Sequence, residues 1–445
     1  MLTQTPQEPP AQDRPRASLY TLGCRLNQAE TAVLADRLAD QGYEIVAFGQ
    51  PADLVVFNSC SVTADAERDC RYLVRRTLRR APRAFIAVTG CYAQTGLDAL
   101  SRVSGIDLIL GNQFKMNLPA YLPMPASLAK RPVPTVLHTK RIDRDEFVQD
   151  GAGRCDGTRA NLKIQDGCSF MCAFCNIPFA RGGERSRRFE DALREAEALV
   201  ARGHRELVLT GVNIGRYESS GRSLLDLIEA LERIDGLDRI RLSSIEPTTV
   251  PDALLDHMAS SAKLCRYLHI PVQSGNDAVL EAMNRHYTAR DYAALIERAA
   301  GRIPDLGLGT DILVGFPGET DGAFAYTLAL AQALPFSYFH VFPYSSRPGT
   351  GAIKLAGAVP SKTIALRVAK LADLSRAKRL AYYRRLTGRT VRVLFEAPEP
   401  DGLRAGWTDN YVRVGIRTDR DLRNTIADVR VVGAMDGLAV GELAA

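Results

Sequence analysis

The chain has 445 residues, enough for roughly two to four domains with separate cores. With 46% hydrophobic and 24% charged residues it has the composition of a soluble protein, and no apolar run approaches the ~20 residues that a membrane-spanning helix needs. The net charge of +6 is a mild bias that permits an acidic partner.

Residues 1–17 are polar and rich in proline, without the apolar core of a secretion signal. We expect a disordered leader and a cytoplasmic protein. A reducing cytoplasm disfavours disulfides, so clustered cysteines there are expected to bind metal or to act in catalysis. The nine cysteines form an odd number, which excludes complete pairing.

Residues 18–125 are predicted to form an N-terminal domain in which one pattern occurs three times. An apolar strand-like run ends in a cysteine and is followed by a helical stretch. The runs SLYTLGC, DLVVFNSC and RAFIAVTGC end at Cys24, Cys60 and Cys91. The pattern predicts an open parallel βα sheet with helices from near Gln28, Asp65 and Gln94. Ligands of such sheets lie beyond the carboxyl ends of the strands, where all three cysteines fall.

Two stretches of the chain are strongly basic. From Arg68 to Arg83 seven arginines recur at helical spacing, and from Lys362 to Arg392 there are ten basic residues against one acid, Asp373. A single stretch of this kind is most often a solvated helix face. Two in one chain favour a polyanion such as RNA.

The central part of the chain alternates strand and helix candidates. Residues 126–153 are rich in proline and charge and are predicted to be a linker, and residues 154–382 contain six strand candidates separated by helical segments. This order predicts a partial parallel (β/α)6 barrel with its chemistry at the strand carboxyl ends. Residues 383–445 have short alternating runs, which predict a small all-β domain.

Three cysteines, Cys168, Cys172 and Cys175, follow the first strand of the predicted barrel in the stretch GCSFMCAFCN. A zinc site usually has four ligands, but only Cys155 and His204 flank this stretch. Three thiolates on one loop suit a [4Fe–4S] cube whose fourth iron stays open. The three N-terminal cysteines would build a second such cluster. A zinc-dependent RNA-binding module without catalysis is the alternative from another class. Cys70, Cys155 and Cys265 are expected to be ordinary thiols.

From about Ser18 to its end the chain resembles the methylthiotransferases of the radical S-adenosylmethionine superfamily, and the last segment is similar to their OB-like TRAM domain. The matching stretches are GCRLNQAET, FNSCSVTADAE, TGCYAQ, IQDGCSFMCAFCNIPFARGGERSR, LTGVNIG, SSIEP, HIPVQSG, MNRHYT, DILVGFPGET and FHVFPYSSRPGT. One small departure is that Ser59 and Ser61 stand where threonines are expected.

The resemblance implies two [4Fe–4S] clusters, with Cys168, Cys172 and Cys175 at the radical site and Cys24, Cys60 and Cys91 at an auxiliary site. S-adenosylmethionine would serve both as methyl donor and as source of a 5′-deoxyadenosyl radical. The residues expected to face this cofactor are Gly211, Asn213, Ser244, Glu246, Gln273 and Gly315. The arginines of ARGGERSR, Arg181, Arg185 and Arg187, could meet a carboxylate, an RNA phosphate or a structural ion-pair partner.

The family has three substrate branches. They act on tRNA carrying N6-threonylcarbamoyladenosine, on tRNA carrying isopentenyladenosine, and on an aspartate of a ribosomal protein. GCRLNQAET, FNSCSVTADAE and GCYAQ look most like the threonylcarbamoyladenosine branch, whose substrate is position 37 of tRNA. Expected partners are therefore tRNA, contacted by the TRAM domain and the basic helices, and an electron donor such as flavodoxin or ferredoxin, with neither membrane nor DNA.

Overall fold

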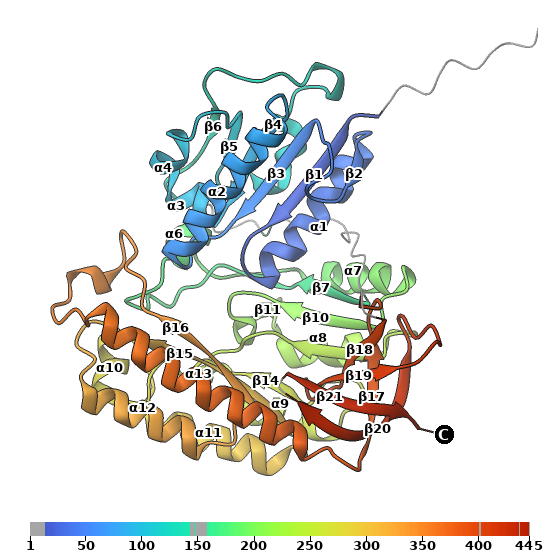
Figure 1. Ribbon diagram of the computed structural model, residues 1–445, viewed down its shortest axis with the longest axis vertical. Coiled ribbons are helices and arrows are strands. Elements are labelled where there is room, and N and C mark those ends of the chain that lie inside the picture. The colour runs from blue at the N-terminus through green and yellow to red at the C-terminus, as the bar shows by residue number, and fades with distance from the viewer. Residues whose placement is uncertain (1–13, 143–146, 148–157, 400–401, 436, 445) are drawn as a thin grey trace, which may run out of the picture.

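The computed structural model describes residues 14–142, 147, 158–399, 402–435 and 437–444. Residues 1–13 of the predicted leader, most of the predicted linker after residue 142, and Cys155 lie outside this part. Figure 1 shows an N-terminal sheet domain above a central partial barrel, with a small C-terminal β-barrel beside the latter. None of the helices in the described ranges is long and apolar enough to cross a membrane.

The N-terminal domain is a six-stranded parallel sheet in the order β2-β1-β3-β4-β5-β6. Its central strands β3 and β4 are buried along their whole length, as their continuous apolar runs predict. Helices α1 and α2 cover opposite faces over separate apolar cores. The bounds are β1 Arg16–Thr21, α1 Arg25–Asp40, β2 Glu44–Val46, β3 Leu54–Ser59, α2 Ala64–Arg80, β4 Phe85–Gly90, α3 Cys91–Thr95, α4 Leu97–Ser101, β5 Leu108–Leu110, η1 Lys115–Asn117, α5 Leu118–Tyr121, η2 Pro125–Ser127 and β6 Thr135–Leu137.

This domain differs from the sequence-based pattern in two places. The third helical stretch is divided into α3 and α4 at Gly96, where the backbone leaves the helical conformation with φ −121°. A side chain would not fit there, since a Cβ on Gly96 would lie 2.1 Å from Cε2 of Tyr92. Strand β6 lies within residues 126–153, which the sequence assigns to the linker. It is a three-residue edge strand flanked by proline, too short to give a periodic signal.

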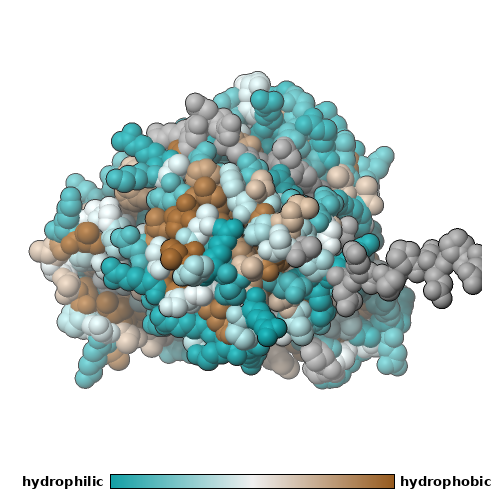
Figure 2. Space-filling model, turned by 90° about the horizontal axis from the view of Figure 1, so that it is seen from above, coloured by the Kyte–Doolittle hydropathy of each residue, from teal (hydrophilic) through white to brown (hydrophobic). Residues whose placement is uncertain are grey.

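The face of the molecule seen from above shows apolar patches between hydrophilic ones (Figure 2). Among the exposed large apolar side chains of the N-terminal domain are Met124, Val133 and Val136. Val136 belongs to β6, which has a neighbour on one side only. Because β6 has only three residues, the sheet edge that it forms is short, and short edge strands disfavour pairing with other chains.

The central domain contains the six predicted parallel strands, β7, β10, β13, β14, β15 and β16. They form two three-stranded sheets, β13-β10-β7 and β14-β15-β16, that are joined by the parallel bridges Ile240–Leu264 and Ser244–His269. Helices cover the outside of this partial barrel over one large apolar core. The predicted fold class is confirmed.

The elements of this domain follow in chain order. They are β7 Arg159–Lys163, β8 Gln165–Asp166, α6 Ile177–Arg181, β9 Arg185–Ser186, α7 Phe189–Ala201, β10 Glu206–Thr210, η3 Ile214–Arg216, β11 Glu218–Ser219, β12 Arg222–Ser223, α8 Leu224–Glu232, β13 Arg239–Leu242, η4 Pro247–Thr249, α9 Asp252–Ser260, β14 Tyr267–His269, α10 Asp277–Ala282, α11 Ala289–Arg302, β15 Gly307–Val314, α12 Asp321–Ala333, β16 Tyr338–Pro343, η5 Gly351–Lys354 and α13 Ser361–Arg384.

The C-terminal domain is a closed barrel in the order β17-β18-β19-β21-β20, consistent with a TRAM-like domain. Arg241 Nη1 donates to the carbonyl of Asp409 (2.8 Å) and Arg239 Nη1 to that of Trp407 (2.7 Å). Both arginines come from β13, and Arg239 is its first residue, so this barrel sits at the amino ends of the central strands. Its strands are β17 Thr390–Phe395, β18 Leu403–Trp407, β19 Arg413–Arg417, β20 Ile426–Met435 and β21 Leu438–Leu443.

Candidate active site

Cys24, Cys60 and Cys91 lie at the carboxyl ends of β1, β3 and β4, which are neighbours in the sheet. Cys24 precedes α1 and is exposed, whereas Cys60 and Cys91 are buried at 6% and 3% exposure. Gly23, which precedes Cys24, lets the backbone of this turn lie close to Cys60. It has φ +102°, and a Cβ on it would lie 2.9 Å from Cys60 Sγ. The structure thus brings the three cysteines of the predicted auxiliary site to one edge of the sheet.

The electrostatics of this edge favour a positively charged group between the sulfurs. The pKa of Cys60 is raised to about 12, chiefly by burial and in part by the neighbouring Cys91 and Cys24, because thiolates repel one another. A thiolate is the form that ligates metal, so a bound cationic group would supply the missing stabilisation. Three thiols converging at one edge are a donor set that fits an iron–sulfur cluster.

The second set, Cys168, Cys172 and Cys175, lies on the loop after β8, and all three side chains are half-buried. Burial raises the pKa of Cys168 to about 11 and that of Cys175 to about 12. These thiols therefore also need a cationic group before they ionise at neutral pH.

The loop that carries these three cysteines is hydrogen-bonded to two segments that are distant in the sequence. The amide of Ala173 donates to Met283 O (2.9 Å), and Asn284 Nδ2 donates to Met171 O (2.9 Å). The amide of Ala352 donates to Ala173 O (2.7 Å). The cysteine loop is therefore held by hydrogen bonds with residues 283–284 and with Ala352.

Arg285 connects this loop to a predicted cofactor residue. Its Nη1 lies 3.3 Å from Cys172 Sγ and 3.3 Å from Glu246 Oε1, and its Nη2 also pairs with Glu246. Only 8% of Arg285 is exposed. The MNRHYT motif alone gives this arginine no role, because the partners of a single charged residue cannot be deduced from the sequence.

Gly211 and Asn213 lie on the loop after β10, and this loop is bound by Gln165. Gln165 Oε1 accepts from the amides of Val212 (2.8 Å) and Asn213 (2.9 Å), and a Cβ on Gly211 would lie 2.8 Å from the same oxygen. Asn213 is 2% exposed, and its Nδ2 has no hydrogen-bond partner among the described residues. A buried amide donor without a protein acceptor fits a polar ligand at this place.

The other predicted cofactor residues differ in their surroundings. Ser244 forms a parallel bridge with His269, and Gln273 has a left-handed φ of 66° beside β15. Gly315 is buried, and a Cβ on it would lie 2.4 Å from Ile364 of α13. The small size of Gly315 thus allows helix packing, and a contact of this residue with the cofactor stays a prediction.

The described residues contain no group of three His, Cys, Asp or Glu side chains arranged around a single metal ion. A four-iron cube is larger than one ion and takes each thiolate at a different iron. Three cysteines can therefore hold such a cube without meeting around a single ion. Of the other thiols, Cys70 and Cys265 are buried at 0% and 1% exposure, as expected for ordinary core cysteines.

A buried network of charged side chains lies where the two main domains meet, and its acidic centre is Glu30, a residue that no sequence pattern singles out. Glu30 Oε1 and Oε2 each accept from Arg181 at 3.0 Å. Lys115 Nζ (2.6 Å) and Lys163 Nζ (2.8 Å) bind the same carboxylate. Although burial opposes its ionisation, these cations hold the pKa of Glu30 well below its usual value. A water-sized cavity of about 30 Å³ adjoins the network.

Comparisons with protein-family models and with solved structures show the general class of this protein. Residues 162–331 match the Radical SAM superfamily, and residues 16–111 match Uncharacterized protein family UPF0004. A solved structure of a radical S-adenosylmethionine methyltransferase, TsrM from Kitasatospora setae, covers 76% of this chain and 77% of its own, with TM-score 0.52 and 17% identity. That likeness shows a shared fold.

Full-length relatives define the family. The chain is 34% identical to threonylcarbamoyladenosine tRNA methylthiotransferase MtaB of Bacillus subtilis (strain 168), over 94% of each chain. It is 36% identical to the MtaB of Aquifex aeolicus (strain VF5), over 85% of this chain and 92% of the relative. It is 35% identical to the tRNA-2-methylthio-N(6)-dimethylallyladenosine synthase of Jannaschia sp. (strain CCS1), over 99% and 96%.

The chain therefore belongs to the radical S-adenosylmethionine methylthiotransferase family, as its motifs predict. It is an enzyme of this kind, with S-adenosylmethionine and [4Fe–4S] clusters as cofactors.

Proposed function

We propose that this protein methylthiolates N6-threonylcarbamoyladenosine at position 37 of tRNA, at carbon 2 of the adenine. The observation that carries the proposal is the pair of cysteine triplets at strand ends of two domains in one chain. Relatives named for threonylcarbamoyladenosine and for dimethylallyladenosine are similarly identical, at 34% and 35%, so identity alone does not choose the base. The choice rests on the residues around the N-terminal cysteines.

Cys168, Cys172 and Cys175 would hold one cluster in the central domain, residues 154–382. Cys24, Cys60 and Cys91 would hold the other in the N-terminal domain, residues 18–125. When bound, the clusters supply the electron that opens S-adenosylmethionine and the place at which sulfur is held. An adenine C–H bond has no acidic proton at neutral pH, so side-chain acids and bases cannot open it.

The surrounding residues orient and screen the site. Asn213 Nδ2 would donate a hydrogen bond to the cofactor, because it is buried and has no acceptor in the described part of the protein. Arg285 would hold Glu246 and the Cys172 sulfur together by its short contacts to both. Burial raises the pKa of Cys172, and the positive charge of Arg285 beside its sulfur offsets part of that rise.

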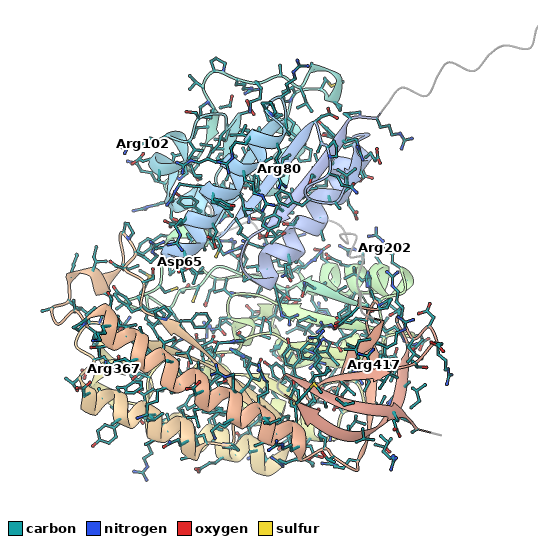
Figure 3. All side chains as sticks on the ribbon, in the orientation of Figure 1. Asp65, Arg80, Arg102, Arg202, Arg367 and Arg417 are labelled. Carbon is teal, nitrogen blue, oxygen red and sulfur yellow. The ribbon has the colours of Figure 1, made fainter. Side chains whose placement is uncertain are left out.

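Helix α2 provides the strongest candidate surface for RNA phosphate. Asp65 and Arg80 mark its two ends in Figure 3. The side chains of five arginines on or just after α2 have no hydrogen bond or ion pair with the described residues; they are Arg75, Arg76, Arg79, Arg80 and Arg83. Unpaired arginines at helical spacing can contact successive phosphates.

The second basic stretch is partly used inside the protein. Arg367 is buried and pairs with Glu319 (2.8 Å) and Asp321 (2.6 Å). Lys378 Nζ donates to the carbonyls of Gln332 (2.9 Å) and Leu334 (2.7 Å). We therefore propose that α2 and the C-terminal barrel, residues 383–445, contribute most of the tRNA contact, with α13 in a smaller part. A flavodoxin or ferredoxin would supply electrons, and a cytoplasmic location follows from the substrate.

Nucleoside mass spectrometry of bulk tRNA from cells with and without the gene tests this proposal. Loss of 2-methylthio-N6-threonylcarbamoyladenosine with accumulation of its precursor is the expected result. Loss of the 2-methylthio derivative of dimethylallyladenosine instead would assign the second candidate, the reaction for which the Jannaschia relative is named. An unchanged tRNA profile would contradict both and move the assignment to a ribosomal-protein aspartate.

A further inference from the structure

The short helix α6 begins two residues after Cys175 and runs to the N-terminal domain. Asn176, which precedes it, donates through Nδ2 to the carbonyl (2.9 Å) and hydroxyl (3.1 Å) of Ser61. Ser61 directly follows Cys60. The chain next to a ligand of the radical site is thus bonded to the chain next to a ligand of the auxiliary site.

A second link from α6 reaches Cys91. Asn112 Nδ2 donates to the carbonyl of Ala180 in α6 (2.7 Å) and lies 3.8 Å from Cys91 Sγ. The first link and this one come from different loops of the N-terminal domain. Two of the three auxiliary cysteines are therefore tied to the same five-residue helix.

The third link is made by Arg181, the last residue of α6. Its Nη2 donates to Asn27 Oδ1 (2.6 Å), while Asn27 Nδ2 donates to the carbonyls of Leu22 (2.8 Å) and Ser59 (3.1 Å). These two carbonyls belong to the turns that lead to Cys24 and Cys60. Through Asn27, Arg181 therefore fixes the turns of the remaining auxiliary ligands.

The environment of Arg181 makes this arrangement rigid. The side chain is 2% exposed and makes a two-point contact with Glu30 and a further one with Asp166 Oδ1 (2.9 Å). Removing one partner from a buried ion pair is strongly destabilising locally, because the other charge is left uncompensated. The network has four basic and two acidic members, Lys115, Lys163, Arg181, Arg185, Glu30 and Asp166. Its excess positive charge lies near Cys91.

We propose that Arg181 is a positioning residue that holds the auxiliary cluster in one fixed place relative to the radical site, so that cofactor cleavage is coupled to methylthio transfer. The inference rests on the proposed function, since it requires both clusters. Coupling has a simple physical reason. A carbon radical formed at the substrate must meet the methylthio group within bonding distance, and a displacement of about 1 Å can cost on the order of 100-fold in rate.

The test compares Arg181→Gln with the matched variant Arg241→Gln. Arg241 is also a buried arginine, 1% exposed, in a two-point contact with a glutamate, Glu206 (2.7 and 3.1 Å). It contacts the C-terminal barrel through the carbonyls of Thr408 and Asp409 and the ring of Tyr411, and within the described residues it makes no direct contact with a cluster cysteine. If Arg181→Gln does not fold, Arg181→Lys replaces it as the test variant, because lysine keeps the positive charge opposite Glu30.

The first readout is independent of turnover. In anaerobically reconstituted and reduced protein, the magnetic interaction between the two clusters is measured by electron paramagnetic resonance. The Arg181 variants are expected to change or broaden this interaction, and Arg241→Gln to leave it as in the unaltered protein. The second readout is the ratio of 5′-deoxyadenosine to methylthiolated nucleoside, which should rise on the order of 10-fold or more for Arg181→Gln alone.

An unchanged magnetic interaction and an unchanged product ratio in the Arg181 variants would overturn the positioning role. Equal changes in Arg241→Gln would do the same, because they would show a general effect of losing a buried arginine. Failure of the proposed function is distinguishable from either outcome. In that case the unaltered protein itself would contain fewer than the roughly eight iron atoms per chain that two [4Fe–4S] clusters require.

Discussion

Tyr411 of the C-terminal barrel accepts a hydrogen bond from Arg25, the residue that follows Cys24, with 2.9 Å between Oη and Nη2. The tyrosine has a left-handed φ of 65° and stacks on Trp407 with ring centroids 4.5 Å apart. The C-terminal barrel is thereby in direct contact with the turn that carries an auxiliary cysteine, although the two segments are 386 residues apart in the sequence.

Replacing Tyr411 with phenylalanine tests this contact. Loss of one hydrogen bond to a charged donor should cost about 1.5 to 3 kcal/mol of stability. The thermal unfolding midpoint of Tyr411→Phe should therefore fall below that of Tyr326→Phe, whose tyrosine is 66% exposed. Equal midpoints for the two variants would show that the contact does not stabilise the protein.

Asn213→Ala should weaken S-adenosylmethionine binding. Removing one hydrogen bond of about 1 to 1.5 kcal/mol corresponds to a loss of up to about 10-fold in affinity. Equilibrium binding to the reconstituted protein measures this, with Asn117→Ala, an exposed asparagine in η1, as the control. If Asn213→Ala binds as the control does, its buried amide does not face the cofactor.

The free arginines of α2 should contribute salt-dependent tRNA affinity. Each lost phosphate contact should reduce the slope of log affinity against log salt by about 0.7 to 0.9. Filter binding or fluorescence anisotropy at several salt concentrations would measure this slope for a triple alanine variant of α2. The control is a second triple alanine variant on exposed arginines of the central domain, which loses the same net charge. The two variants are Arg75/Arg79/Arg80 and Arg194/Arg233/Arg290. Equal loss in both would mean that α2 is not the RNA-binding face.

Cys70 and Cys265 should resist alkylation whether or not iron is bound. Burial raises the pKa of both thiols to about 12, so that at pH 8 roughly 0.01% of each would be the reactive thiolate. After chelation of iron at pH 8, mass spectrometry should find iodoacetamide first on Cys24, which is exposed. Rapid labelling of Cys70 in the iron-loaded protein would contradict its assignment as a core thiol.

The sequence predicted the parts of the site that follow from local pattern. Cys60 and Cys91 each end a buried apolar run, and runs of this kind pair as parallel neighbours, so their meeting at one edge could be expected. The x3 and x2 spacing of Cys168, Cys172 and Cys175 lies within one loop and needs no tertiary information.

The residues that the sequence could not predict act through long-range contacts. Glu30 occupies an interior position of α1, where a charged side chain usually faces solvent. It is buried because Arg181 and Lys163 come from 151 and 133 residues away. Arg285 likewise reaches Cys172 across 113 residues. A buried charge requires partners, and only the folded arrangement shows where they come from.

The measurement that tests the central claim most directly compares two cysteine variants, Cys168→Ala and Cys60→Ala, with S-adenosylmethionine, reductant and substrate tRNA. The quantities measured are 5′-deoxyadenosine and methylthiolated nucleoside. Loss of both products in Cys168→Ala, together with loss of the methylthiolated nucleoside alone in Cys60→Ala, is the predicted result, because the two triplets have separate tasks. Methylthiolated product from Cys60→Ala would contradict the role of the N-terminal cysteines and with it the two-site account.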